Sequence, residues 1–303
     1  MVIITSNNTD KSANLIIDWL IKYNINFLRL NSNDKLKLSF INGETYIEHS
    51  QCSFTINEIK GVFNRGSWFY FNDPSKHGYF KNEYRHLIEY VIFSLNKKPN
   101  VFLNNSNINK LIVSNLAKDC GLNLPEQNIV ETKRDLEKLL SQNLKVCTKS
   151  ISGINTVLYR KHFKSLYTLK LKNDILNRIN FNNFYPSLIQ QYVDKLFEVR
   201  SFVLNDRVFS MAIFSQKHIN SSDDYRKGYN NVRTCAIKLP EDIESKIITL
   251  LTKLNLKSGS IDLIYSKDKK FYFLEVNPSG QFNFLSKACN YNIENQIVKL
   301  FLN

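Results

Sequence analysis

Two segments near the C-terminus, SIDLIY and KFYFLEVN, constrain the fold more than any other feature of the chain. Both alternate between polar and apolar residues around the turn-like segment SKDK, so they predict a β-hairpin. If Asp268 and Lys269 form a two-residue loop, Asp262 lies directly opposite Glu275. Because side chains alternate between the faces of a strand, Asn277 then shares a face with both carboxylates.

The other face of this hairpin is predicted to be apolar. In the same register Lys267 faces Lys270, and the apolar face consists of Ile261, Leu263 and Tyr265 against Tyr272, Leu274 and Val276. A slip by one residue would expose this face, so burial against a core specifies the register.

The polar face of the hairpin is a candidate metal site. Directly opposed side chains lie about 5 Å apart at Cβ, and two carboxylates so placed repel each other unless a proton or a cation lies between them. Asp262, Glu275 and Asn277 offer only hard oxygen donors, which suit Mg²⁺ completed by water and phosphate oxygens. We favour metal binding over the alternative, an exposed polar face on which the repulsion is tolerated.

The length of 303 residues allows about two domains. Residues 1–30 show a β-α-β pattern with a helix around Ser12–Tyr23. Short strands around Asn42-Gly43 and a helix at about Lys81–Leu95 follow. We therefore predict an N-terminal α/β domain at 1–104, and we divide the rest into a central part, 105–188, and a C-terminal part, 189–303. The predicted class is α/β with large antiparallel portions.

The formal net charge of +14 favours an anionic partner such as nucleic acid, nucleotide phosphates or an acidic peptide. A codon-biased genome rich in Lys, Asn and Ile explains the charge equally well. The basic residues are spread along the chain and form no nucleic-acid-binding arm.

The cellular setting is predicted from absent signals. The N-terminus lacks a secretory signal, and no apolar stretch is long enough to cross a bilayer, so we expect a cytoplasmic location and no membrane partner. The five cysteines are far apart and include no CxxC pair, so we expect neither a disulfide framework nor a zinc site. Free thiols fit a reducing compartment.

The pattern D-(x)12-E-x-N on a terminal hairpin is similar to the magnesium site of the ATP-grasp ligases. Further parts resemble that family in the same order: Asn109-Lys110 opening a helix that ends GLNLP, Lys149 in KVCTKSISG, the segment IQQYVDKLFEVRSFVLNDRV, and then Arg233. This match spans roughly residues 105–290. Likeness over the whole length, in MVIITSNNTDKSANLIIDWL, GVFNRGSW and FLEVNPSGQF, is closer to the graspetide synthetases of the grasp-with-spasm maturase type.

The resemblance implies an ATP-grasp fold: an N-terminal pre-ATP-grasp α/β domain, a central lid domain, and a C-terminal antiparallel-sheet domain that carries the metal hairpin. It implies ATP and Mg²⁺ as cofactors. Lys110 and Lys149 would contact the phosphates as compact cations, although Lys110 also fits a solvated surface lysine.

Further nucleotide contacts follow from the same resemblance. The main chain from Gln190 through Gln191 to Val193 would contact adenine, and Glu198 would accept from the ribose hydroxyls. Many relatives have an acidic residue where this chain has Gln190 or Gln191, so the side-chain contact to the adenine amino group stays open.

Four arginines are candidates for contact with the transferred phosphoryl group or the substrate. Arg233 would stabilise charge on the transferred phosphoryl group. Arg200 would meet phosphate or a substrate carboxylate, or would form a plain surface pair with Glu198. Arg65 and Arg226 are candidates for substrate contact, and a structural role fits Arg65 equally well.

The implied reaction is the cyclisation of a ribosomal precursor peptide. ATP phosphorylates an Asp or Glu side chain, and a Ser or Thr hydroxyl, or a Lys amine, then forms an ω-ester or ω-amide link. This reaction needs no covalent enzyme nucleophile, and the chain has no Ser-His-Asp or Cys-His signature. The expected partner is a precursor peptide with a leader and an acidic core; the resemblance also makes a homodimer reasonable.

Three other interpretations stay open. An ATP-grasp ligase that adds glutamate to a protein terminus would share every nucleotide and metal residue. A basic nucleic-acid-binding protein fits the net charge and the 13% aromatic content, but no RNA-binding motif is present, and we expect no nucleic-acid partner. A pseudo-enzyme that only binds peptide is disfavoured by the intact Asp262, Glu275 and Asn277.

Overall fold

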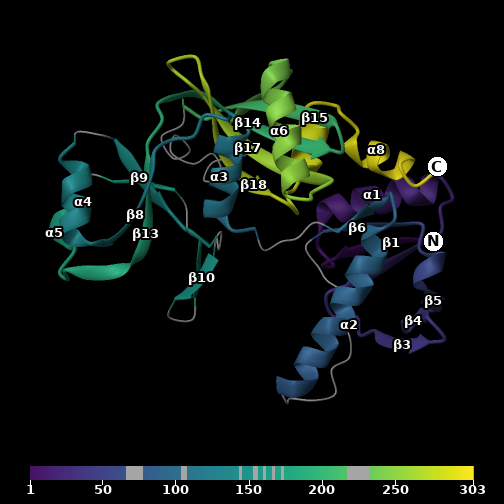
Figure 1. Cartoon of the computed structure of the whole chain (residues 1–303). Helices are drawn as coiled ribbons and strands as arrows, with labels where there is room; N and C mark the ends of the chain where they lie inside the picture. Colours follow the sequence, from purple (N-terminus) through teal and green to yellow (C-terminus); the bar gives the residue numbers. More distant parts are fainter. Residues whose placement is uncertain are drawn as a thin grey trace. The chain divides into compact units, whose positions relative to one another are not determined.

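The computed structural model describes residues 1–65, 78–103, 108–142, 145–152, 156–159, 162–165, 168–171, 174–216 and 232–302 (Figure 1). The chain forms two compact units. Unit 1 comprises Met1–Ser106, Asn255–Gly259 and Pro278–Asn303, and unit 2 comprises Asn107–Leu254 and Ser260–Asn277. Each unit is described by itself.

Unit 1 contains a parallel four-stranded sheet in the order β2-β1-β6-β7. Its strands are β1 (Val2–Ser6), β2 (Phe27–Asn31), β6 (Gly61–Asn64) and β7 (Val101–Phe102). All five residues of β1 are buried, as expected for a strand covered on both faces. The predicted β-α-β start is confirmed: α1 (Lys11–Lys22) follows β1, and the Asp10 side chain caps it by accepting from the Ala13 N–H at 2.7 Å.

The C-terminus of the chain belongs to unit 1. Helices α7 (Asn283–Ala288) and α8 (Ile293–Lys299) pack on α1, and Figure 1 shows α8 beside α1. Gly61 of β6 lies so close to the Phe301 ring that a Cβ there would be 2.4 Å from it. From the sequence we place these residues in the C-terminal part, 189–303. No local pattern in the sequence predicts that they pack on the N-terminal sheet and helix. The three-part division itself stays a prediction.

Two further elements of unit 1 match the expectations. A three-stranded antiparallel sheet consists of β3 (Lys37–Ile41), β4 (Glu44–Glu48) and β5 (Ser53–Thr55), followed by the 3₁₀ turn η1 (Ile56–Glu58). The Asn42-Gly43 turn between β3 and β4 has positive φ at both residues, which only residues such as Asn and Gly adopt readily. The helix predicted at Lys81–Leu95 is α2 (Gly78–Asn96).

Unit 2 begins with the helix α3 (Lys110–Asp119), which the Asn109 side chain caps. An antiparallel sheet in the order β12-β9-β13-β8 follows. Its strands are β8 (Gln127–Thr132), β9 (Val146–Lys149), β12 (Leu169–Lys170) and β13 (Asn183–Gln191), and the helices α4 (Lys133–Leu140) and α5 (Ile175–Arg178) pack against it. A separate hairpin pairs β10 (Thr156–Tyr159) with β11 (His162–Ser165).

The second sheet of unit 2 has five strands in the order β16-β15-β14-β17-β18. They are β14 (Lys195–Leu204), β15 (Arg207–Phe214), β16 (Arg233–Ile237), β17 (Ser258–Ser266) and β18 (Phe271–Asn277), with the helix α6 (Glu241–Lys253) between β16 and β17. Helix α3 contacts both β18 and α6 (Figure 1). The predicted α/β class with large antiparallel portions is confirmed.

The β17–β18 hairpin has the expected register at its polar end but a different loop. Asp262 pairs with Glu275, as predicted. The loop is not the two-residue turn at Asp268-Lys269: the Ser266 N–H donates to the Lys270 carbonyl at 3.0 Å, so Lys267 belongs to a three-residue loop, and Lys269 has a φ of 61°.

A bulge compensates for the longer loop. The register shifts between Asp262 and Leu263, so that Leu274 is an extra residue in β18. Leu263 therefore lies opposite Phe273, and the expected pairing with Leu274 was wrong. One extra residue in the loop and one in the strand cancel, which restores the predicted register where the carboxylates lie.

Candidate active site

Three oxygen-bearing side chains meet on one face of the β17–β18 hairpin in unit 2. The Asn277 amide Nδ2 lies 3.3 Å from Glu275 Oε1 and 3.5 Å from Asp262 Oδ2. In the described part of the chain no group of three or more His, Cys, Asp or Glu residues could hold a metal ion. The three side chains that meet here are two carboxylates and an amide, which the sequence placed on this face; that they bind a metal stays a prediction.

Each carboxylate has its own cation. Lys110 Nζ, on the first residue of α3, lies 3.1 Å from Glu275 Oε2 and donates to the Ser150 carbonyl at 3.3 Å. Arg200 Nη1 donates to both oxygens of Asp262, at 2.8 and 2.7 Å, and Arg200 is 6% exposed. Because these bonds are charge-assisted, they offset the repulsion between the opposed carboxylates. Arg200 therefore does not form the plain surface pair with Glu198 that the sequence left open; it is buried and bonded to Asp262.

Neighbouring positive charges favour the ionised form of Glu275. Burial opposes ionisation of Glu275, but the positive charges of Lys110 and Lys149 outweigh it and hold the pKa of Glu275 well below its ordinary value. Burial also lowers the pKa of Lys149, and the Glu275 carboxylate offsets this only in part. An anion bound beside Lys149 would compensate the cost of burying its charge.

The hinge after β13 leaves one main-chain position available. Gln190 pairs with Gln127 and Cys147 in the sheet, and the Gln191 N–H donates to the Glu126 carbonyl at 2.8 Å. Val193 makes no backbone–backbone hydrogen bond within the described residues. The peptide groups of Val193 therefore have no backbone partner among the described residues, and its contact with adenine stays a prediction.

The side chains near the hinge hold buried polar groups. The Gln190 amide Nε2 is buried and has no hydrogen-bond partner among the residues that the structure describes. Glu198 Oε1 accepts from Lys195 Nζ at 2.6 Å, and both residues are buried. Lys195 was not predicted from the sequence, because residues three apart within a strand point to opposite faces. The pair can form because Lys195 is the first residue of β14.

Arg233 lies on the face of the five-stranded sheet opposite to Arg200. It pairs with Phe214 in β15, and its guanidinium carbon lies 5.6 Å from the centre of that ring. Glu198 pairs with Ile213 in β15, so Arg200, two residues further along β14, lies on the face opposite to Arg233. The role of Arg233 at the transferred phosphoryl group stays a prediction without support from this position. Arg226 lies outside the described residues.

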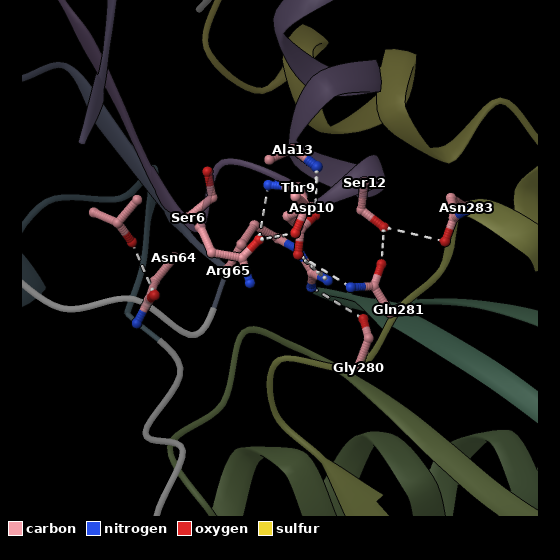
Figure 2. Close-up of polar contacts among 12 residues, drawn as sticks. Ser6, Thr9, Asp10, Ser12, Ala13, Asn64, Arg65, Gly280, Gln281 and Asn283 are labelled. Carbon is pink, nitrogen blue, oxygen red and sulfur yellow. Dashed lines mark hydrogen bonds and ion pairs between the residues drawn. The ribbon is translucent and has the colours of Figure 1, made fainter. Parts of the chain in front are cut away.

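Arg65 belongs to unit 1 and is buried. Its Nη2 lies 3.3 Å from Asp10 Oδ2, and its Nη1 donates to the Gly280 carbonyl at 3.0 Å (Figure 2). An internal carboxylate thus takes the place that we had considered for an acidic substrate group. These contacts favour the structural role that the sequence left open.

The sequence matches the family model of the RimK-like ATP-grasp domain over residues 108–301, which is more than half of the chain. The chain therefore belongs to this family, and the resemblance to ATP-grasp ligases is confirmed. A search of curated proteins finds no match.

Solved structures share the fold over nearly the whole chain. A RiPP-associated ATP-grasp ligase from Chryseobacterium gregarium, in complex with ADP and a leader and core peptide, is 20% identical, with 99% of this chain and 96% of that chain covered and a TM-score of 0.79. The macrocyclase MdnC from Microcystis aeruginosa, bound with the precursor peptide MdnA, is 19% identical, with 100% and 99% covered and a TM-score of 0.77.

A more distant ligase has the same fold. The D-alanine–D-alanine ligase from Bacillus anthracis, complexed with ATP, is 13% identical, with 100% of this chain and 96% of that chain covered and a TM-score of 0.57. At these identities the likeness establishes the fold, and the predicted ATP-grasp fold is confirmed.

Within the described residues no helix is both long and apolar enough to cross a membrane.

Proposed function

We propose that this protein is an ATP-dependent peptide macrocyclase of the graspetide type. It phosphorylates Asp or Glu side chains of a ribosomal precursor peptide and links them to Ser or Thr as ω-esters, or to Lys as ω-amides. The observation that carries the ATP-dependent part is the meeting of Asp262, Glu275 and Asn277 in a RimK-like ATP-grasp domain, with one cation in contact with each of the two carboxylates. Whole-length likeness to ligases bound to precursor peptides supports the peptide substrate.

The donor set fits Mg²⁺. Two ionised carboxylates and one amide supply hard oxygens, and water and phosphate oxygens would complete the shell. Asp262, Glu275 and Asn277 would hold the ion; the Asn277 amide would turn over, so that Oδ1 replaces the Nδ2 that now faces the carboxylates. When bound, the ion would neutralise charge on the ATP phosphates.

The chain's own cations bind and orient the phosphates. Lys110 lies 3.1 Å from Glu275, and Lys149 acts electrostatically on the same carboxylate, so both lysines would be available to phosphates of a nucleotide bound beside Glu275. Glu198 accepts from the ribose, and the peptide groups of Val193 contact adenine. Arg200 donates to both oxygens of Asp262 and so orients this carboxylate.

The reaction needs no enzyme nucleophile. A side-chain carboxylate oxygen of the peptide attacks the γ-phosphorus of ATP, and ADP leaves. A hydroxyl oxygen of the same peptide then attacks the acyl carbon, phosphate leaves with the C–O electron pair, and the hydroxyl proton passes to solvent. The products are an ω-ester, ADP and phosphate. Catalysis then consists of positioning and of charge stabilisation.

The cellular setting and the assembly are part of the same proposal. All five cysteines are thiols outside any disulfide, which fits the reducing conditions of the cytoplasm. A homodimer is the oligomeric state that the family likeness implies.

The activated carboxylate can be trapped. With ATP, Mg²⁺ and hydroxylamine, a small peptide rich in Thr or Ser and in Glu or Asp, encoded beside this protein, is expected to gain a hydroxamate on an Asp or Glu side chain. Fragmentation mass spectrometry locates it, and omission of ATP is the control. A hydroxamate on a terminal α-carboxylate of the acceptor, or on a free amino acid, would instead favour the second candidate that the RimK-like match supports, a ligase that adds an amino acid such as glutamate to a protein or peptide. ATP-independent or absent trapping would refute carboxylate activation.

A further inference from the structure

A buried ion pair of the N-terminal sequence lies in unit 1, where the segment that follows β18 contacts it. The side chains of Arg65 and Asp10 are 2% and 3% exposed. Arg65 is the residue directly after β6, and Asp10 caps α1, so both are fixed by regular elements of the N-terminal sequence. A charged pair this deeply buried is stable only if further hydrogen bonds satisfy it.

Those further bonds come from the segment Pro278–Phe282. Arg65 donates to the Gly280 carbonyl at 3.0 Å, and Gln281 Nε2 donates to Asp10 Oδ2 at 3.0 Å. Ser12 Oγ donates in turn to Gln281 Oε1 at 2.7 Å. Figure 2 shows these side chains converging on Asp10, from α1, from the end of β6 and from the C-terminal segment.

An aromatic residue of the same segment contacts Arg65 as well. Phe282 is fully buried, with its ring 6.5 Å from that of Phe63 and 5.5 Å from the Arg65 guanidinium carbon. The segment between β18 and α7 has no regular secondary structure. Its conformation therefore depends on side-chain contacts and not on a ladder of main-chain hydrogen bonds.

This segment follows the metal-binding residues directly. Strand β18 ends at Asn277, and the next residue, Pro278, begins the part of the chain that returns to unit 1. Asn277 therefore lies three residues before Gly280 and four before Gln281. Whatever fixes these two residues also restricts the main chain of Asn277.

We propose that Asp10, Arg65 and Gln281 are positioning residues that hold the end of β18 in the conformation that binds the metal. This inference rests on the proposed function of Asp262, Glu275 and Asn277. It gives the N-terminal α/β unit a part in nucleotide chemistry, because the chain's first 65 residues set the geometry of a metal ligand 212 positions beyond Arg65.

Gln281→Leu tests this without leaving a charge unpaired, since Asp10 keeps Arg65 and the Ala13 N–H. We would measure Mn²⁺ binding to the full chain in the presence of ADP, from the loss of the free-ion electron paramagnetic resonance signal. Gln281→Leu is expected to weaken Mn²⁺ binding about tenfold, since outer partners of metal ligands contribute tenfold or more. Ser12→Ala, which removes the bonds to Gln281 Oε1 and Asn283 Oδ1 but leaves Gln281 on Asp10, is expected to weaken it less.

A matched control separates positioning from general loss of stability. Leu95→Ala opens a cavity in the core of the same unit and is expected to lower the melting temperature at least as much as Gln281→Leu, with Mn²⁺ affinity unchanged. Unchanged affinity in folded Gln281→Leu, or equal weakening in Leu95→Ala, overturns the positioning role alone. Unchanged affinity in Glu275→Ala overturns the metal site, and this inference with it.

Discussion

Glu275→Ala is expected to fold and to lose ATP turnover by at least about 1000-fold. The reason is that Glu275 is one of three side-chain donors to the proposed metal, and a metal's charge stabilisation is worth several kcal/mol, at about 1.4 kcal/mol per tenfold change in rate. The substitution also removes the Lys110 contact, which costs about 1–3 kcal/mol of stability. ADP release at saturating ATP and Mg²⁺ measures the first effect, and thermal unfolding measures the second.

Glu137→Ala provides a matched control, because this carboxylate is exposed on α4 of the same unit. Its turnover should equal that of the unmodified protein. Normal turnover in folded Glu275→Ala would contradict the metal assignment, whereas loss of turnover together with loss of the folded state would have to be resolved with Glu275→Gln, which preserves the side-chain shape.

Arg200→Met is expected to lower kcat by about 100-fold or more, with a smaller change in the KM for ATP. Arg200 holds both oxygens of Asp262, so its loss removes a positioned cation from the proposed site of phosphoryl transfer. It also leaves the Asp262 carboxylate half-buried without its cation. That costs about 3 kcal/mol, at the lower end for a broken buried pair because the Asp262 side chain keeps 17% exposure.

A double substitution distinguishes the two effects of Arg200. Arg200→Met combined with Asp262→Asn removes the charge that Arg200→Met leaves behind, so it should recover much of the lost stability and none of the activity. The turnover of Arg200→Lys should lie between that of the unmodified protein and that of Arg200→Met, since lysine keeps the charge but cannot reproduce the planar guanidinium contact. If Arg200→Met turns over ATP normally at unchanged stability, Arg200 has neither role.

The carboxylate pair could be predicted from the sequence because the register of the two strands and the types of the residues agreed there. Alternation in β17 and β18 placed Asp262, Glu275 and Asn277 on one face, and the structure confirms the register at these residues. The loop could not be predicted: SKDK is compatible with two-residue and three-residue turns. The bulge at Leu274 has no local signature, and it alone keeps the carboxylates opposed despite the longer loop.

Long-range partners set the limit of prediction elsewhere. Arg65 has apolar neighbours in the sequence, and nothing near it reveals that Asp10 and the Gly280 carbonyl satisfy its guanidinium. Arg233 was placed by its position before the metal hairpin, whereas its face depends on the register of three strands. Both cases turn on pairings between residues far apart in the chain, which local patterns cannot specify.

The central claim is that ATP drives ring formation in a peptide. The most direct test is the intact mass of the small Thr/Ser- and Glu/Asp-rich peptide encoded beside this protein, after incubation with the full chain, ATP and Mg²⁺. We predict the loss of one water for each ring formed, dependent on ATP and reversed by mild base where the link is an ester. An unchanged peptide mass while ATP is consumed with another acceptor would contradict the macrocyclase and leave an ATP-grasp ligase of another kind.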